Sequence, residues 1–222
     1  HLASYGFIVA APDHPSRDLF NVLGASASGD RDAPVDELLA TRSLVRDDPV
    51  LGPLVGMSFA AVGHSAGGGT VLALATRGAE SLLGYVSLAA GSGEAAMPDL
   101  PSLFIAGSLD ALVPPEASAA AHANAPSPST FWLIDGAGHN AFDDFCRVGG
   151  GTGIIGIAEA SGLGPLLDAQ PQLRALGEDG CLPPALDVAI TAPVINAAIT
   201  AQLLEWFDQA APSLDAWPND EV

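Results

Sequence analysis

Short apolar runs alternate with segments of helical periodicity along most of the chain. The apolar runs occupy residues 6–14, 57–62, 85–92, 102–110 and 130–139. The segments in which apolar residues recur at helical spacing occupy residues 32–49, 69–78, 114–125 and 191–209. Five buried strands that alternate with helices are typical of a parallel sheet covered on both faces. The pattern therefore predicts an α/β fold, a three-layer sandwich around a mostly parallel sheet.

Residues 147–190 interrupt this alternation. They are rich in glycine and contain one short helical patch. A chain of 222 residues is long enough to bury one sizeable core. We therefore expect a single domain over residues 1–222, in which residues 147–190 are an inserted, loop-rich elaboration.

A tight corner follows the second apolar run, where "GHSAG" (63–67) places Ser65 between two glycines. The chain turns there from a strand into a helix, which holds a serine in a strained backbone conformation. We expect that side chains at positions 63 and 67 would collide in such a turn. The helix aims the N–H group of Ala66 at the place where an oxyanion would form. The pentapeptide alone also fits an ordinary strand-to-helix turn.

Two further candidates follow apolar runs of their own, namely Asp110 and His139. The carboxyl ends of parallel strands meet at one edge of a sheet, so we expect both side chains near Ser65. A neutral imidazole can remove the proton of a serine hydroxyl near pH 7, and a buried carboxylate fixes the imidazole tautomer. The order serine, aspartate, histidine, each after its own strand, favours a catalytic triad over an ordinary turn.

Four segments of the chain resemble the α/β-hydrolase fold. They are "LASYGFIVAAPDH", "GHSAGG", "AGSLDALVPP" and "GAGHNAF", which together run from residue 2 to residue 142. Within that fold they are similar to dienelactone-hydrolase-like esterases, which are grouped with chlorophyllases, platelet-activating-factor acetylhydrolases and polyester-degrading cutinases. True dienelactone hydrolases carry a cysteine nucleophile. The serine at position 65 therefore favours ordinary carboxylic ester hydrolysis, with no cofactor and no metal.

The same resemblance implies that part of the fold lies outside this sequence. In the α/β-hydrolase fold the segment 6–14 corresponds to the fourth strand, so three strands are expected before residue 1. The loop after the third strand normally supplies the second N–H donor of the oxyanion hole, beside Ala66. Losing one such donor costs about 100- to 1000-fold in rate. We expect an N-terminally truncated domain that is inactive or poorly folded by itself.

Several residues near the predicted triad have a second interpretation. His64 is expected to point away from the corner and to pack or form a pocket wall. Trp132 and Phe142 are candidates for the substrate pocket, although aromatic residues at such positions more often belong to the core. Asp135 lies near His139 in the sequence, but it shares a strand end with it, so Asp110 is the preferred acid. No set of residues has the spacing of metal ligands.

Charge and cysteine content restrict the partners and the compartment. The chain has 26 acidic and 7 basic residues, for a net charge of −19, which repels nucleic acids and anionic membranes. No apolar stretch approaches the roughly 20 residues of a membrane-spanning helix. Cys146 and Cys181 are either two unrelated thiols or a disulfide. A disulfide would stabilise the fold by about 3–4 kcal/mol and would indicate a secreted or periplasmic protein.

The sequence thus predicts a serine carboxylic ester hydrolase of the carboxylesterase, lipase or cutinase type. Its substrate would be a small-molecule or polymeric ester, polyester and lipid-type esters included. Two alternatives stay open. One is a non-catalytic binding protein with the same fold, and the other is a perhydrolase or a lactone or amide hydrolase with the same triad.

Overall fold

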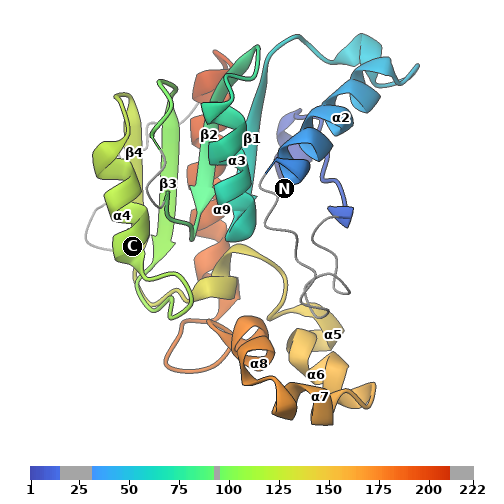
Figure 1. Ribbon diagram of the computed structural model, residues 1–222, viewed down its shortest axis with the longest axis vertical. Coiled ribbons are helices and arrows are strands. Elements are labelled where there is room, and N and C mark those ends of the chain that lie inside the picture. Colours follow the sequence, from blue (N-terminus) through green and yellow to red (C-terminus); the bar gives the residue numbers. More distant parts are fainter. Residues whose placement is uncertain (16–31, 93–95, 211–222) are drawn as a thin grey trace.

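A four-stranded parallel sheet forms the centre of the computed structural model, which describes residues 1–15, 32–92 and 96–210. The strands are β1 (Phe59–His64), β2 (Leu82–Leu88), β3 (Ser102–Gly107) and β4 (Ser129–Ile134). They lie side by side in the order β1-β2-β3-β4, and every neighbouring pair is parallel (Figure 1). The predicted α/β class is confirmed. Because all four strands point the same way, their carboxyl ends share one edge of the sheet.

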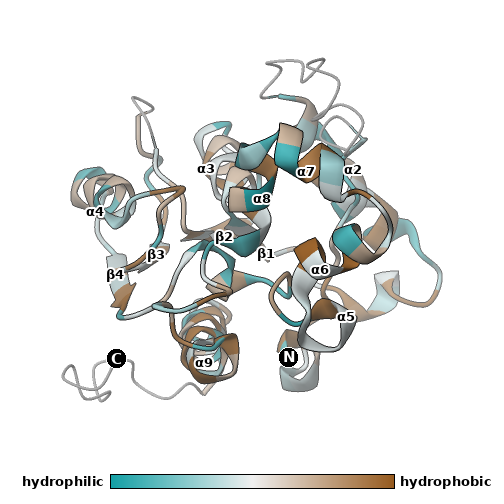
Figure 2. Cartoon of the chain, turned by 90° about the horizontal axis from the view of Figure 1, so that it is seen from below, coloured by the Kyte–Doolittle hydropathy of each residue, from teal (hydrophilic) through white to brown (hydrophobic). Residues whose placement is uncertain are grey.

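Helices cover both faces of this sheet. The helices that contact it are α3 (Ala66–Thr76), α4 (Pro115–Asn124) and α9 (Val188–Trp206). Figures 1 and 2 show α3 and α4 on one face and α9 on the other. A further helix, α2 (Ala33–Asp47), packs beside α3. The predicted helical segments are therefore present, and the sheet is the middle of three layers.

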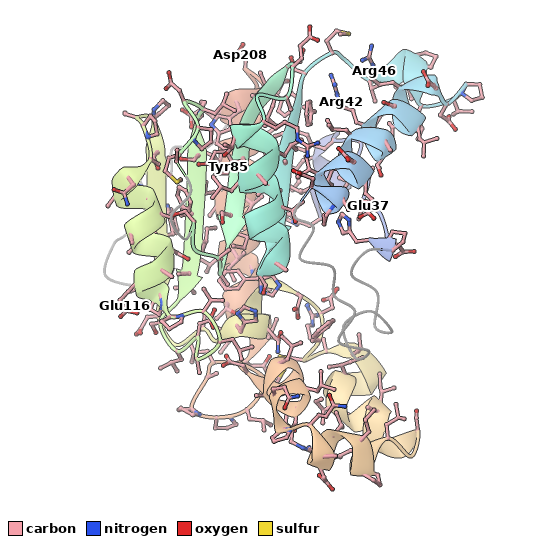
Figure 3. The ribbon with its side chains drawn as sticks, viewed as in Figure 1. Glu37, Arg42, Arg46, Tyr85, Glu116 and Asp208 are labelled. Atoms are coloured by element: carbon pink, nitrogen blue, oxygen red, sulfur yellow. A yellow bond between two sulfur atoms is a disulfide. The ribbon has the colours of Figure 1, made fainter. Side chains whose placement is uncertain are left out.

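The hydrophobic core is divided between the two faces by strand alternation. Val86 and Leu88 of β2 join a buried cluster with Ile195 and Ile199 of α9. Tyr85, which lies next to Val86, belongs instead to the cluster on the opposite face with residues of α3 (Figure 3). Successive side chains of a strand point to opposite faces, so one strand contributes to both clusters.

The predicted strand at residues 6–14 is not formed. Within the described part of the chain these residues make no backbone hydrogen bond to another strand, and Val9 is 56% exposed. A cavity of about 390 Å³, lined by Phe7, Ile8 and Val62 among others, lies between this segment and β1. An apolar run becomes a strand only where a neighbouring strand accepts its hydrogen bonds, and none of the described segments does so. The segment is held at its end by His14, whose Nδ1 lies 2.6 Å from Glu37 Oε2 on α2.

Residues 147–190 contain four short helices where the sequence predicted mainly loop. They are α5 (Val148–Gly151), α6 (Gly153–Ala160), α7 (Gly164–Ala169) and α8 (Pro171–Glu178). Prolines in the first turn of α7 and α8 begin those two helices, because a proline there loses no helical hydrogen bond. The prediction of a mainly loop structure was wrong because the high glycine content made the beginnings of these helices difficult to recognise in the sequence. Figure 1 places the four helices beyond the carboxyl ends of the strands.

Single-turn helices and a disulfide complete the described structure. The 3-10 helices are η1 (Leu2–Tyr5), η3 (Gly52–Leu54) and η4 (His139–Phe142). Cys146 and Cys181 are joined by a disulfide with an S–S distance of 2.05 Å, so the reading of two unrelated thiols is wrong. The bridge joins the loop after α8 to the loop after η4, and the segment between the two cysteines contains α5, α6, α7 and α8.

Helix α9 is long and apolar enough to cross a membrane. No segment of this length and hydrophobicity was predicted from the sequence. Half of its apolar stretch is buried, because Ile195, Ile199 and Leu203 pack on β2 and β3. Its hydrophobicity is accounted for by this contact with the sheet.

Candidate active site

Ser65 occupies a strained corner at the carboxyl end of β1. Its backbone has φ 54° and ψ −118°, and it is immediately followed by α3. The Ser65 N–H donates to Leu88 O at 2.8 Å, which fixes the corner to the end of β2. A non-glycine residue at such angles costs about 1–3 kcal/mol and persists only where its surroundings hold it. This is the conformation expected of a nucleophile at a strand-to-helix turn.

The glycines of the corner do not all serve the same purpose. A Cβ at Gly63 would overlap the carbonyl group of Gly67 and lie 2.8 Å from Gly68 N. A Cβ at Gly67 would meet no atom within 4 Å among the described residues. A Cβ at Gly68 would lie 2.5 Å from the Ala90 Cβ. The predicted collision therefore occurs at position 63, but not at position 67, and the second close contact belongs to position 68.

Asp110 and His139 form a buried pair at the same edge. Asp110 Oδ2 lies 2.8 Å from His139 Nδ1, and the two side chains are 0% and 1% exposed. The other carboxylate oxygen, Oδ1, accepts the N–H groups of Leu112 at 3.0 Å and Val113 at 2.7 Å. These two bonds orient the carboxylate, so that Oδ2 accepts the Nδ1–H of the imidazole. Nε2 of His139 then carries the lone pair that a general base needs.

Asp135, the other acid considered from the sequence, lies elsewhere. It is exposed, and its carboxylate accepts the hydroxyl of Ser108 at 3.0 Å. None of the hydrogen bonds of the described residues joins it to His139. The geometry thus agrees with Asp110 as the partner of the imidazole.

The third predicted contact is not formed. Among the described residues, no hydrogen bond joins Ser65 Oγ to the His139 ring. The ring of His64, the residue before Ser65, has its centroid 4.7 Å from that of His139. Catalytic hydrogen bonds are often long before a substrate binds and tighten only in the complex. The structure therefore brings Asp110 and His139 together and leaves Ser65 at the adjacent corner.

His64 packs, which is one of the two roles expected of it, and one of the rings it contacts is that of His139. Its Nδ1 lies 3.5 Å from Asp143 Oδ2, and its ring contacts Phe142 with a centroid distance of 5.7 Å. Burial, and then the neighbouring His139, lowers the pKa of His64 to about 4. Burial raises the pKa of Asp143 to about 6. At neutral pH the pair therefore consists of an uncharged imidazole and a carboxylate.

Asp143→Asn is expected to stabilise the protein in a pH-dependent way. The folded pKa of Asp143 lies above the unfolded value of 3.8, so ionisation costs stability as the pH rises from about 4 through 6. Asparagine removes that cost and can still accept the Phe145 N–H that Asp143 Oδ1 accepts at 2.8 Å. The urea midpoint of the variant should exceed that of the wild type at pH 7.5 and approach it at pH 4.5. Equal differences at both pH values, or the same result for the exposed Asp99→Asn, would contradict this assignment.

The aromatic residues proposed for the pocket have different surroundings. Trp132 lies in β4 and packs, partly buried, on the core cluster that includes α9. Packing in the hydrophobic core therefore accounts for the position of Trp132. Phe142 packs on the same cluster and also on His64, so it lies beside the site. The sequence offered no signal for Asp143, because its role depends on a contact with a residue 79 positions earlier.

Ala66 opens α3, so its amide lies at the N-terminal end of an 11-residue helix. That end of a helix carries a partial positive charge and suits a developing oxyanion. Within the described ranges, no group of three or more histidine, cysteine, aspartate or glutamate side chains is arranged to hold a metal ion.

Comparison with known proteins finds similarity only among solved structures. No family model matches the chain, and no curated protein matches it. An α/β serine hydrolase homologue from Coxiella burnetii matches with a TM-score of 0.41 and 21% identity, over 50% of this chain and 52% of its own. A predicted CIB-like hydrolase from Thermoplasma acidophilum has a TM-score of 0.40 and 20% identity, over 50% of this chain and 51% of its own.

A dienelactone hydrolase from Anabaena variabilis has a TM-score of 0.45 and 16% identity, over 64% of this chain and 62% of its own. The match thus spans about half to three-fifths of the length of these structures.

Proposed function

We propose that this protein is a serine hydrolase that cleaves carboxylic esters through an acyl-enzyme. The observation that carries the proposal is the buried Asp110–His139 pair, joined at 2.8 Å beside the strained corner of Ser65. A buried carboxylate that holds an imidazole in one tautomer next to a strained serine is the arrangement that nucleophilic catalysis requires.

The reaction proceeds in two halves. Ser65 Oγ attacks the ester carbonyl carbon while His139 Nε2 takes the hydroxyl proton, and Ala66 N–H stabilises the oxyanion. The intermediate collapses with loss of the alcohol, which leaves with the proton from His139. Water, deprotonated by His139, then attacks the acyl-enzyme and releases the acid and free Ser65. In both halves Asp110 stabilises the imidazolium. The reaction requires Ser65 Oγ to come within hydrogen-bond reach of His139 Nε2, while His139 Nδ1 keeps its hydrogen bond to Asp110.

A second candidate function is favoured by one observation. Among the described residues, no hydrogen bond joins Ser65 Oγ to His139. A protein that uses this fold only for binding would also lack this hydrogen bond. Such a protein would need no activated serine.

Labelling with a serine-directed fluorophosphonate separates the two functions. We expect the complete gene product to be labelled at a single residue, identified as Ser65 by peptide mass spectrometry. Ser65→Ala should be unlabelled, His139→Ala should react at least 100-fold more slowly, and the exposed Ser43→Ala should react as the wild type does. A folded protein that is not labelled, or is labelled elsewhere, would refute the hydrolase and leave the binding protein.

The disulfide bears on where this reaction would take place. Disulfides persist in oxidising compartments, so the Cys146–Cys181 bridge supports a secreted or periplasmic hydrolase.

A further inference from the structure

One carboxylate bridges the loops that carry the acid and the base. Asp179 Oδ2 accepts the N–H of Ala111, the residue after Asp110, at 3.0 Å. Asp179 Oδ1 accepts the N–H of His139 itself at 2.7 Å. The Asp179 carbonyl oxygen also accepts the N–H of Asn140 at 2.9 Å. A single residue thus makes three backbone hydrogen bonds to the two loops.

The two backbones approach so closely that glycine is required on both sides. A Cβ at Gly138 would lie 2.6 Å from Gly180 N and 2.8 Å from Asp179 Oδ1. Gly180 has φ +85°, and a Cβ there would lie 2.9 Å from the Gly138 carbonyl carbon. Such distances are incompatible with side chains unless the backbone moves. The position of Asp179 is therefore part of how the loop before His139 is built.

The segment that contains Asp179 is fastened on both sides. Two residues after it, Cys181 forms the disulfide with Cys146. Three residues before it, the Leu176 carbonyl accepts the side-chain N–H of Asn140 at 2.8 Å. Asp179 thus reaches the triad from a segment that is itself covalently tied to the loop after His139.

We propose that Asp179 is a positioning residue that holds the Asp110 loop and the His139 loop at the separation that keeps Asp110 Oδ2 hydrogen-bonded to His139 Nδ1. This inference rests on the proposed function. The two loops leave different strands and are 29 residues apart in the chain, so their alignment depends on what bridges them. A misplacement of 1 Å can cost about 100-fold in rate. Asp179 itself makes no hydrogen bond to the imidazole among the described residues, and it acts only through the backbone.

Two substitutions and one matched control test this role in the complete gene product. Asp179→Ala removes both side-chain hydrogen bonds. We expect kcat for an ester to fall about 10- to 100-fold with KM changed less than twofold, and the downfield proton resonance of the His139 Nδ1–H to broaden or vanish. Asp179→Asn should be intermediate, because an amide accepts through only one oxygen. It also serves as the folded variant if the alanine variant does not fold.

Asp48→Ala is the control. Asp48 Oδ1 also accepts two backbone N–H groups, those of Val50 and Leu51, both at 2.8 Å, and none of the hydrogen bonds of the described residues joins this loop to Asp110 or His139. It should lose stability but keep kcat within twofold. An unchanged kcat and an unchanged resonance in folded Asp179 variants would overturn the proposal, as would an equal loss of kcat in Asp48→Ala.

Failure of the proposed function is recognised separately. If the wild type is not labelled by the fluorophosphonate, the reaction is wrong, and the His139 resonance alone decides about Asp179. Its loss in the Asp179 variants then supports the positioning role, and its persistence overturns it.

Discussion

Replacing Asp110 with asparagine should lower kcat for ester hydrolysis by about 10⁴-fold without unfolding the protein. The backbone N–H groups of Leu112 and Val113 would hold the amide oxygen at the position of Oδ1, so the amide NH₂ would face His139 Nδ1. Nδ1 must then accept, and the ring proton moves to Nε2. An imidazole protonated at Nε2 cannot take the proton of Ser65, so the general base is lost while the fold is kept.

Asp135→Asn is the matched control, because Asp135 is the other acid near His139 in the sequence and bonds instead to Ser108. Its kcat should stay within twofold of the wild type. The test measures kcat of both variants by steady-state kinetics and compares their folding by circular dichroism. A large loss in Asp135→Asn and a small one in Asp110→Asn would reverse the assignment of the acid.

A methyl group at position 63 should destabilise the protein by about 3 kcal/mol or more. In Gly63→Ala the added Cβ would overlap the Gly67 carbonyl group, which is backbone and cannot rotate away. The corner must then open, and the strained conformation of Ser65 is lost with it. We expect a lower urea midpoint of unfolding and no fluorophosphonate labelling of the folded fraction.

Gly67→Ala makes the opposite test within the same motif. A Cβ there meets no described atom within 4 Å, and alanine favours a helix over glycine by up to about 1 kcal/mol. Its urea midpoint should equal or exceed that of the wild type. Similar losses in the two variants would show that the glycines act through chain flexibility and not through the close contact at position 63.

The strands and main helices were accessible from the sequence because their signals are local. The runs at 57–62, 85–92, 102–110 and 130–139 each overlap a strand, and the proline-initiated segment at 114–125 contains α4. The same reasoning failed for residues 6–14, whose apolar run requires a neighbouring strand that the described chain does not supply. It also failed for α5 to α8, since short helices stabilised by mutual packing have weak local signals.

The candidate site was accessible in part. The corner of Ser65 and the pairing of Asp110 with His139 follow from strand ends that share one edge of the sheet. The contact of His64 with His139 and Asp143 could not be predicted, because it depends on the path of η4 above the sheet. The hydrogen bonds by which Asp179 joins the Asp110 and His139 loops could not be predicted either.

The sequence by itself determined the α/β layering, the glycine requirement at position 63 and the order of serine, aspartate and histidine after successive strands. These features depend on backbone preferences and side-chain alternation, which act over a few residues. Only the tertiary structure decided that the two cysteines pair and that Asp179 joins the two loops. These contacts join residues 35 to 68 positions apart, and their geometry is set by how the loops pack, which no local pattern records.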